Sequence, residues 1–323
     1  MVAGATLSAD LSDAEWLDAL RTLGEESGAF SDLGKAHAAV FAEQSHDVLL
    51  VSFETMFGIR SGSEHGTPIA FDICERRNWS HMSLIAKHQS WFRDESVYGF
   101  FDRLIDYGYF DQFDKVLFYG AGMCGYAAAA FSVAAPGSTV LMVAPQATLE
   151  RRRAGWDDRF PSARRLDFST RYAYAPDMLD AADTAYLVYD PGEIEDAMHA
   201  SLFNASNVYP VRFRRGGAGA IEADLKSMSL ISQICEASVR GELSVGRLSK
   251  LLRARKRHVP YLRALLSRVL AEDRPALTAR LCRAVLAEQP LPRFKQQLEK
   301  AEIQLGIRPR EGSGQPESDS QLS

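Results

Sequence analysis

Residues 115–130, KVLFYGAGMCGYAAAA, decide the fold that this sequence predicts. An apolar run of strand type enters a glycine-rich turn, and a helix of small residues leaves it. The turn contains Gly120, Gly122 and Gly125, which fit the spacing G-x-G-x-x-G. Glycine tolerates positive φ and lets another backbone segment approach closely. A strand, such a turn and a helix in this order are typical of α/β folds with parallel strands.

Further apolar runs on both sides of this stretch predict a whole sheet. The expected strands are residues 46–53, 115–119, 139–144, 184–189 and 207–213. Each run is almost continuously apolar, which is typical of strands that are covered on both faces. Helical patterns at about 95–110 and 124–135 separate some of these strands. The sequence therefore predicts an α/β fold with a mostly parallel, doubly wound sheet.

Helices are also predicted in the first hundred residues. An amphipathic pattern covers residues 11–28, and a second helical stretch is expected at about 31–44. The segment 76–92 is rich in Trp, Ser and His, and it has two interpretations. Polar side chains such as Ser80 and His81 could line a binding surface beside the turn. Alternatively, Ser80 is the N-cap of a further helix.

The glycine turn has one interpretation as a nucleotide site. A dinucleotide fold uses G-x-G-x-x-G between a strand and a helix, and the pyrophosphate binds at the helix N-terminus. The acidic residue that would hold the ribose is absent, because the next strand ends in Ala144, Pro145 and Gln146. The three arginines at 151–153 could instead favour the 2′-phosphate of NADP. An NADP-binding oxidoreductase of Rossmann type is therefore an alternative. The first expectation is a protein that binds no cofactor.

A second interpretation of the turn is a nucleophile elbow. The segment resembles the YGxSMGGY turn found in a branch of the α/β-hydrolase family. The matching residues are Tyr119, Gly120, Met123, Gly125 and Tyr126. The resemblance implies a sharp strand-to-helix turn that holds one side chain above the sheet. Gly122 stands at the position of the nucleophile, so the attacking oxygen is missing.

The resemblance extends over roughly residues 45–220. Residues 187–191, LVYDP, resemble the strand end that carries the acid of the family, here Asp190. Residues 213–219, FRRGGAG, resemble the histidine loop, and Ala218 stands where the histidine is expected. Because a Ser–His–Asp mechanism needs both the nucleophile and the base, the resemblance implies a non-hydrolytic binding or regulatory protein. Its ligand-binding residues would be Gly120, Gly122, Met123, Gly125 and Ala218.

Cys124 supports a third interpretation, a hydrolase that uses a thiol. It lies at the start of the helix after the turn, and a helix N-terminus lowers a thiol pKa. The alternative is a small buried residue without chemistry. The other cysteines are Cys74, Cys235 and Cys282, and none of the four forms a CxxC pair. Free thiols and a cytoplasmic location are therefore expected.

Arginines at a strand end form a candidate anion site. Arg212, Arg214 and Arg215 follow the last predicted strand, at the kind of edge where open α/β sheets bind ligands. With the arginines at 151–153 they could bind phosphate, sulfate or a sugar acid. The alternative is that they pair with acidic residues of the same domain.

The charge of the chain is unevenly distributed and indicates two modules. Residues 225–310 carry a net charge of +11, whereas residues 1–224 carry −13. Only helical patterns follow residue 225. A basic helical module makes nucleic acid a candidate partner, and docking on an acidic neighbour is the alternative. The expected divisions are an N-terminal helix and tail (1–29), the α/β-hydrolase-like domain (30–222), the helical module (223–306) and a disordered tail (307–323).

Several functional classes have no support in the sequence. No run of 18 apolar residues predicts a membrane span, and the seven histidines show no metal-ligand spacing, so no metal is expected. Similar proteins are sometimes labelled phosphoadenosine phosphosulfate reductases, which use a Ser-Gly-Gly-x-Asp loop and a Glu-Cys-Gly-x-His thiol. Neither motif occurs here, since Cys282 lies in ARLCRAV. The substrate, the ligand and the oligomeric state are not determined by these patterns.

Overall fold

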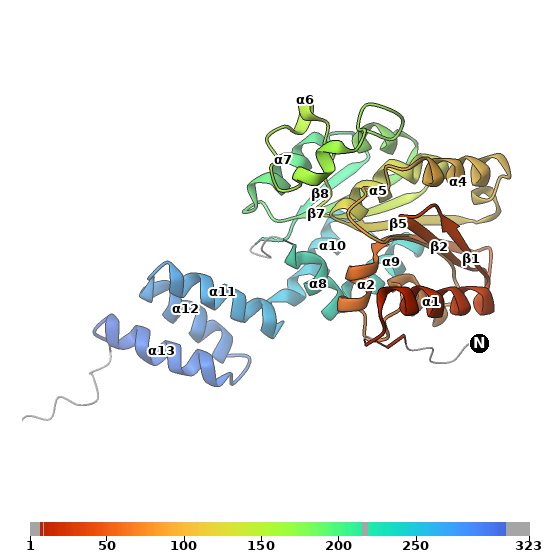
Figure 1. Cartoon of the computed structure of the whole chain (residues 1–323). Coiled ribbons are helices and arrows are strands. Elements are labelled where there is room, and N and C mark those ends of the chain that lie inside the picture. The colour runs from red at the N-terminus through yellow and green to blue at the C-terminus, as the bar shows by residue number, and fades with distance from the viewer. Residues whose placement is uncertain (1–6, 9, 215–218, 308–323) are drawn as a thin grey trace, which may run out of the picture. The chain divides into compact units, whose positions relative to one another are not determined.

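A computed structural model describes residues 7–8, 10–214 and 219–307 of the chain (Figure 1). The chain divides between Arg253 and Ala254 into two compact units. The first unit contains all the strands of the described residues, and the second is helical. No helix in the described part of the chain has both the length and the apolar character needed to cross a bilayer.

The first unit is built on an eight-stranded sheet with the strand order β1-β2-β4-β3-β5-β6-β7-β8. The strands are β1 (Ala29–Leu33), β2 (His37–Ala42), β3 (Val48–Thr55), β4 (Ser80–Ala86), β5 (Lys115–Ala121), β6 (Thr139–Val143), β7 (Thr184–Tyr189) and β8 (Val208–Arg212). The six strands from β4 to β8 in this order are parallel, whereas β1 and β2 are antiparallel to their neighbours. All five predicted strands are present, and the predicted mostly parallel, doubly wound sheet is confirmed.

Helices cover both faces of this sheet. The α-helices of the first unit are α1 (Asp13–Ser27), α2 (Met56–Gly62), α3 (Ile69–Glu75), α4 (Glu95–Asp106), α5 (Met123–Phe131), α6 (Arg151–Ala154), α7 (Ile194–Leu202), α8 (Ala220–Ser227), α9 (Leu230–Val239) and α10 (Val245–Leu251). Short 3₁₀ turns are η1 (Phe110–Gln112), η2 (Ser132–Ala134), η3 (Pro161–Arg165), η4 (Ala175–Ala181) and η5 (Leu252–Lys256). Figure 1 shows α4, α5 and α7 on one side of the sheet and α1, α2, α8 and α9 on the other.

The larger hydrophobic core lies between the sheet and the α4–α5 layer. Phe53 of β3, Phe101 of α4 and Phe131 of α5 stack there with ring centroids 4.5–6.1 Å apart. A smaller core fixes α1 on the other face through the buried side chains of Trp16 and Leu20. The stacked phenylalanine rings bury large apolar surfaces and hold α4 and α5 against the sheet.

The helix predicted at 31–44 is wrong, because this segment is the antiparallel hairpin β1–β2. Gly34 begins the reversal with φ 65°, a conformation that an L-residue rarely adopts. β2, with the sequence HAAVFA, then lies between β1 and β4, and almost every position in it is buried. Alanine has the highest helix propensity of all residues, but pairing with two neighbours in the sheet overrides this local preference.

The helix with Ser80 as its N-cap is also absent, because Ser80 begins strand β4. Its hydroxyl donates to Ser45 O at 2.6 Å and accepts from the Gln44 N–H at 2.9 Å. His81 is 2% exposed and packs against the ring of Phe71 at 4.2 Å. These buried side chains belong to the interior, so they do not form the binding surface that the segment suggested.

The second compact unit starts later than the composition predicts. Its helices α11 (Val259–Ala271), α12 (Pro275–Leu286) and α13 (Pro292–Gln304) have a small core of their own, which includes Leu266, Cys282 and Phe294. Helices α8 to α10 belong to the first unit instead, although composition placed the boundary at 222/223. An amphipathic pattern shows that a helix has an apolar face, but not which surface that face covers.

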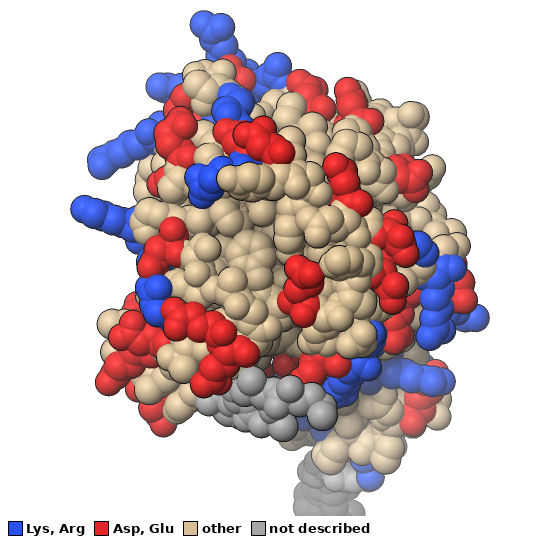
Figure 2. All heavy atoms as spheres, turned by 90° about the vertical axis from the view of Figure 1, so that its right-hand side faces the viewer, with Lys and Arg blue, Asp and Glu red and all other residues tan. Residues whose placement is uncertain are grey.

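The two edges of the sheet differ from its centre. β1 is a short antiparallel strand that carries Asp32, and β8 contains Pro210 and ends at Arg212. Figure 2 views the molecule from the side of α1 and β1, where acidic side chains are spread over the surface with uncharged groups between them. The exposed acidic residues of α1, such as Asp18 and Glu25, belong to the strongly negative part of the sequence.

Candidate functional site

The turn between β5 and α5 has a sharply bent backbone at Gly122. Its φ is 57° and its ψ is −124°, so the backbone adopts a conformation that is strained for other residues. The Gly122 N–H donates to Val143 O at 2.9 Å, and its carbonyl accepts from the Tyr126 N–H at 3.0 Å. A Cβ atom built on Gly122 would meet no heavy atom within 4 Å. The apex of the turn is therefore fixed by its neighbours and open where a side chain would stand.

The two other glycines of the turn are required by packing. A Cβ atom on Gly120 would lie 2.1 Å from the carbonyl oxygen of Cys124. A Cβ atom on Gly125 would lie 3.1 Å from both the Gly120 carbonyl oxygen and the Pro145 side chain. Close approach of α5 to β5 and β6 is thus a sufficient reason for both glycines, without a bound phosphate.

Asp190 lies at the same edge of the sheet as Gly122. It follows β7 directly, while Gly122 follows β5, and parallel strands end on one edge. Its side chain is buried, and its carboxylate accepts from the Gly192 N–H at 2.9 Å. The other predicted members of this site, Ala218 and Arg215, lie outside the described residues. The structure therefore brings the apex and the acid to one edge.

Cys124 differs from the activated thiolate that its position predicts. It is 5% exposed, and burial raises its pKa well above the usual range for a thiol. The negative charges of Glu222 and Glu54 raise this pKa further. The surroundings of Cys124 therefore favour the protonated thiol.

The predicted anion-binding arginines are distributed over two segments. Arg212 and Arg214 are exposed at the end of β8 and just beyond it. Arg153 pairs with Glu150 at 3.3 Å and lies 4.0 Å above the ring of Tyr174. Arg153 thus has partners within its own segment, as the ion-pair alternative expects. Met123, the remaining predicted site residue, is buried at the first position of α5.

A buried polar network lies beneath the turn, and sequence reasoning missed it. Glu54, at the end of β3, accepts from the Ile69 N–H at 2.9 Å and from the Ser52 hydroxyl at 3.2 Å. Its second oxygen lies 3.9 Å from the ammonium group of Lys226 on α8. Lys226 pairs more closely, at 2.8 Å, with Glu222 of the same helix. Glu222 also accepts from the Tyr119 hydroxyl of β5 at 3.0 Å.

The charges of this network are unequal. Two carboxyl groups, Glu54 and Glu222, share the single ammonium group of Lys226. Burial is the main cause that raises the pKa of Glu54 to about 7, and the charge of Glu222 raises it further, while Lys226 lowers it. A carboxyl group of this kind holds a proton near neutral pH and is typical of sites with acid–base or binding roles.

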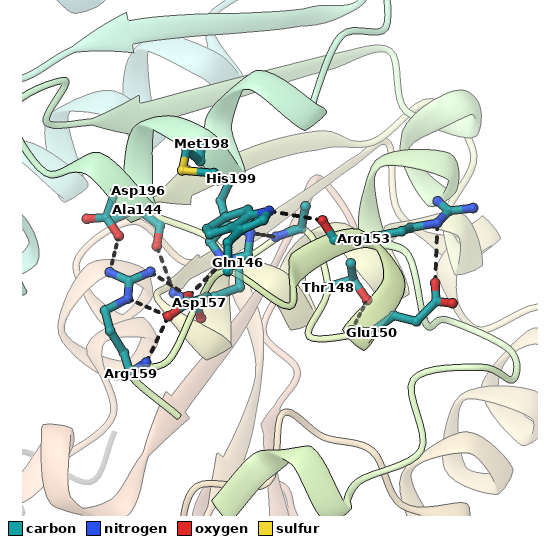
Figure 3. Close-up of polar contacts among 12 residues, drawn as sticks. Ala144, Gln146, Thr148, Glu150, Arg153, Asp157, Arg159, Asp196, Met198 and His199 are labelled. Carbon is teal, nitrogen blue, oxygen red and sulfur yellow. Dashed lines mark hydrogen bonds and ion pairs between the residues drawn. The ribbon is translucent and has the colours of Figure 1, made fainter. Parts of the chain in front are cut away.

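A second buried network lies in the long connection after β6 (Figure 3). The Ala147 N–H donates to Nδ1 of His199 at 3.2 Å, so the proton of the ring is on Nε2, which donates to Asp157 at 2.9 Å. Arg159 pairs with Asp157 at 2.8 Å and with Asp196 of α7 at 2.7 Å. These contacts join the connection between β6 and β7 to α7.

Sequence signals for the two networks are weak. The first network has one recognisable signal in the sequence, because Glu54 is an acidic residue at the end of an apolar strand. His199 lies in a helix, 42 residues from Asp157. No spacing rule connects residues this far apart, so only the folded chain brings them together. Among the described residues, no group of three His, Cys, Asp or Glu side chains could bind a metal ion.

Comparisons with known proteins concern the fold alone. No family model matches the chain, and the search of curated proteins found no relative. A glycosylation-associated protein complex from Streptococcus agalactiae matches with a TM-score of 0.42 and 13% identity, over 62% of this chain and 44% of that chain. This chain thus spans less than half the length of that protein.

Two esterase structures are similar over most of their length. A thermophilic carboxylesterase cloned from a metagenomic library has a TM-score of 0.40 and 15% identity, over 74% of this chain and 100% of that chain. A hyperthermophilic esterase from the archaeon Pyrobaculum calidifontis has a TM-score of 0.42 and 15% identity, over 75% and 95%. The elements of the chain itself form a mostly parallel eight-stranded sheet with helices on both faces, and further helices follow toward the C-terminal end of the described residues.

Proposed function

We propose that this protein binds a ligand at the turn around Gly122 and does not hydrolyse it. The observation that carries the proposal is the apex of the turn. Its backbone has the strained conformation that would present a nucleophile, and the space for that side chain is open, yet the residue is glycine. A group of the ligand can occupy the place that a hydroxymethyl group would fill.

The surroundings of the apex support binding rather than hydrolysis. Asp190 is retained as a buried acid at the same edge, but an acid alone cannot activate a nucleophile without a base. The resemblance assigns the position of the base to Ala218, which has no titratable group. Cys124 is buried with a raised pKa, so it is a poor source of thiolate.

The helix after the turn gives the ligand a chemical preference. α5 begins at Met123, and the first N–H groups of a helix have no partner inside it. These donors and the helix dipole favour a carbonyl or carboxylate oxygen of the ligand next to Gly122. The proposed ligand is therefore an acyl compound whose oxygen faces the turn.

The missing triad members are tested by restoring them. We expect no turnover of short-chain p-nitrophenyl esters above the buffer rate by the wild type, Gly122→Ser or Ala218→His. The double variant should show weak activity, because a serine and a base can then form a pair with Asp190. Adding Asp190→Asn to the double variant should reduce this activity.

A matched control separates chemistry from backbone strain. Gly137 has φ 80° and, like Gly122, open space around a built Cβ atom. It lies before β6, at the opposite edge of the sheet. Gly137→Ser combined with Ala218→His should stay inactive. Turnover by the wild type that disappears in Cys124→Ser would contradict the proposal and favour a thiol hydrolase.

A further inference from the structure

The network beneath the turn attaches α8 to the ends of β3 and β5. Ile221 and Leu225 provide the apolar contacts of α8 and are 2% and 0% exposed. Lys226 and Glu222 provide its polar contacts, to Glu54 of β3 and Tyr119 of β5. These contacts therefore attach α8 to the two strands that end at the edge where Gly122 lies.

The groups that face Glu54 come from five elements. They are Ser52 of its own strand, the Ile69 N–H of α3, Tyr119 of β5, Cys124 of α5, and the Lys226 and Glu222 pair of α8. Only Lys226 is positively charged, and it lies closer to Glu222 than to Glu54. Proximity to a second carboxylate disfavours ionisation of Glu54 in the docked helix.

Two charge states of the network therefore differ in how well they fit the closed site. When Glu54 holds a proton, one carboxylate and one ammonium group are paired at 2.8 Å. When Glu54 is ionised, the site contains an additional negative charge that is shielded from water. Opening of α8 would hydrate this charge, and hydration is the state that an ionised carboxylate prefers.

We propose that α8 is a pH-dependent latch, closed on β3 and β5 when Glu54 is protonated and opened more readily when Glu54 is ionised. Opening exposes the Tyr119 hydroxyl and the Glu54 carboxyl group, which contact Glu222 and Lys226 of the closed helix. The latch is a property of the network itself and holds whether or not the turn binds a ligand.

The size of the effect follows from proton linkage. The pKa of Glu54 is about 7 in the closed state, and its ordinary value of 4.5 applies when the group is hydrated. Because the open state releases the proton at lower pH, a higher pH favours opening. Between pH 6 and pH 8, the equilibrium constant for opening should rise by about tenfold.

Hydrogen exchange of the whole chain tests the latch. Protection factors of the amides in 223–227, which are hydrogen-bonded within α8, are measured at pH 6 and pH 8, after correction for the pH dependence of the intrinsic exchange rate. The wild type should lose about tenfold in protection at the higher pH. Glu54→Gln keeps the size of the side chain and cannot ionise, so its protection should be equal at the two pH values.

Two results would overturn the latch, and each can be obtained independently. One is a difference of less than twofold between the protection factors of these amides at pH 6 and pH 8 in the wild type, a measurement that needs no variant. The other is a pH dependence that persists in Glu54→Gln. Glu236→Gln is the matched control, because Glu236 pairs with Arg77 at 2.7 Å and fixes α9 outside this network. It should leave the pH dependence of α8 unchanged.

Discussion

Two carboxyl groups of this protein have the same low solvent exposure, but their pKa values are shifted in opposite directions. Glu54 beneath the turn and Asp157 in the connection after β6 are each 4% exposed. The pKa of Glu54 is raised to about 7, whereas hydrogen bonds from His199 and Arg159 hold the pKa of Asp157 well below its usual range. Burial raises both pKa values, and it raises that of the more deeply buried Glu54 further, whereas the lowered pKa of Asp157 comes from its partners.

The partners differ in number and in charge. Asp157 accepts from the Arg159 backbone at 3.0 Å, from two guanidinium nitrogens at 2.9 and 2.8 Å, and from His199 at 2.9 Å. Glu54 accepts from two neutral donors, and its nearest cation, Lys226, is 3.9 Å away and shared with Glu222. Charged donors in direct contact therefore decide which form of a buried carboxyl group is stable.

The largest expected effect is the loss of the Asp157 carboxylate. Asp157→Asn leaves the ring of His199 without its acceptor charge and Arg159 with only Asp196. We expect the free energy of unfolding to fall by about 3 kcal/mol, as for other buried pairs that lose one partner. Denaturant titration at pH 7 measures this.

A neighbouring residue provides the control for this change. The Asp158 side chain is 83% exposed and pairs with Arg164 on the surface. Asp158→Asn should therefore change the unfolding free energy by about 0.5 kcal/mol or less. Equal losses of unfolding free energy in the two variants would contradict this prediction. The charged contacts of the buried Asp157 would then stabilise the protein no more than those of the exposed Asp158.

The next effect concerns the pH dependence that Glu54 confers on stability. Its pKa is higher in the folded than in the unfolded chain, so the folded state binds the proton more tightly. The stability is fully present below the unfolded value of 4.5 and is lost as the pH rises towards 7 and beyond. Relative to Glu54→Gln, the wild type should lose about 2.5 kcal/mol between pH 5 and pH 8.

Denaturation of both proteins across this range measures the difference. The pKa of Asp157 is shifted in the other direction, so its contribution is lost only as the pH falls below the unfolded value of 3.8. Stability of the wild type that rises relative to Glu54→Gln between pH 5 and pH 8 would refute the assignment of a raised pKa to Glu54.

The smallest effect is expected for a single hydrogen bond of the first network. Tyr119→Phe removes the donor to Glu222, and Glu222 keeps its pairing with Lys226. The free energy of unfolding should fall by about 1 kcal/mol at pH 6. Tyr186→Phe is the control, because it loses a bond of similar length, 2.9 Å to Leu243 O, away from both networks. Only Tyr119→Phe should also alter the pH dependence attributed to Glu54.

The sequence predicts the parts of this molecule that are encoded locally. The apolar runs of β3 and β5 to β8 and the glycine turn at 120–125 are recognisable because strand and turn chemistry depends on neighbours in the chain. The hairpin β1–β2 and the strand β4 were mistaken for helices. β2 and β4 lie inside the sheet and bury Ala, Ser and His side chains. Their conformation depends on pairing with distant segments of the chain.

The candidate site divides in the same way. Gly122 and Asp190 follow predicted strands, so their common edge can be predicted from parallel pairing. Glu54 and Lys226 are 172 positions apart, by the difference of their residue numbers, and meet only because α8 returns to the sheet. Charge imbalance inside a network is a property of the assembled contacts, and no local pattern encodes it.

The two edges of the sheet also affect how separate molecules meet. An exposed strand edge can pair with a strand of another molecule and start aggregation. Pro210 of β8 has no N–H to offer to an incoming strand, and Arg212 adds a charge at the end of the same strand. At the other edge, β1 is only five residues long and carries the charged Asp32. Both edges therefore discourage intermolecular β-pairing, and a crowded solution of this protein should remain free of sheet-to-sheet association.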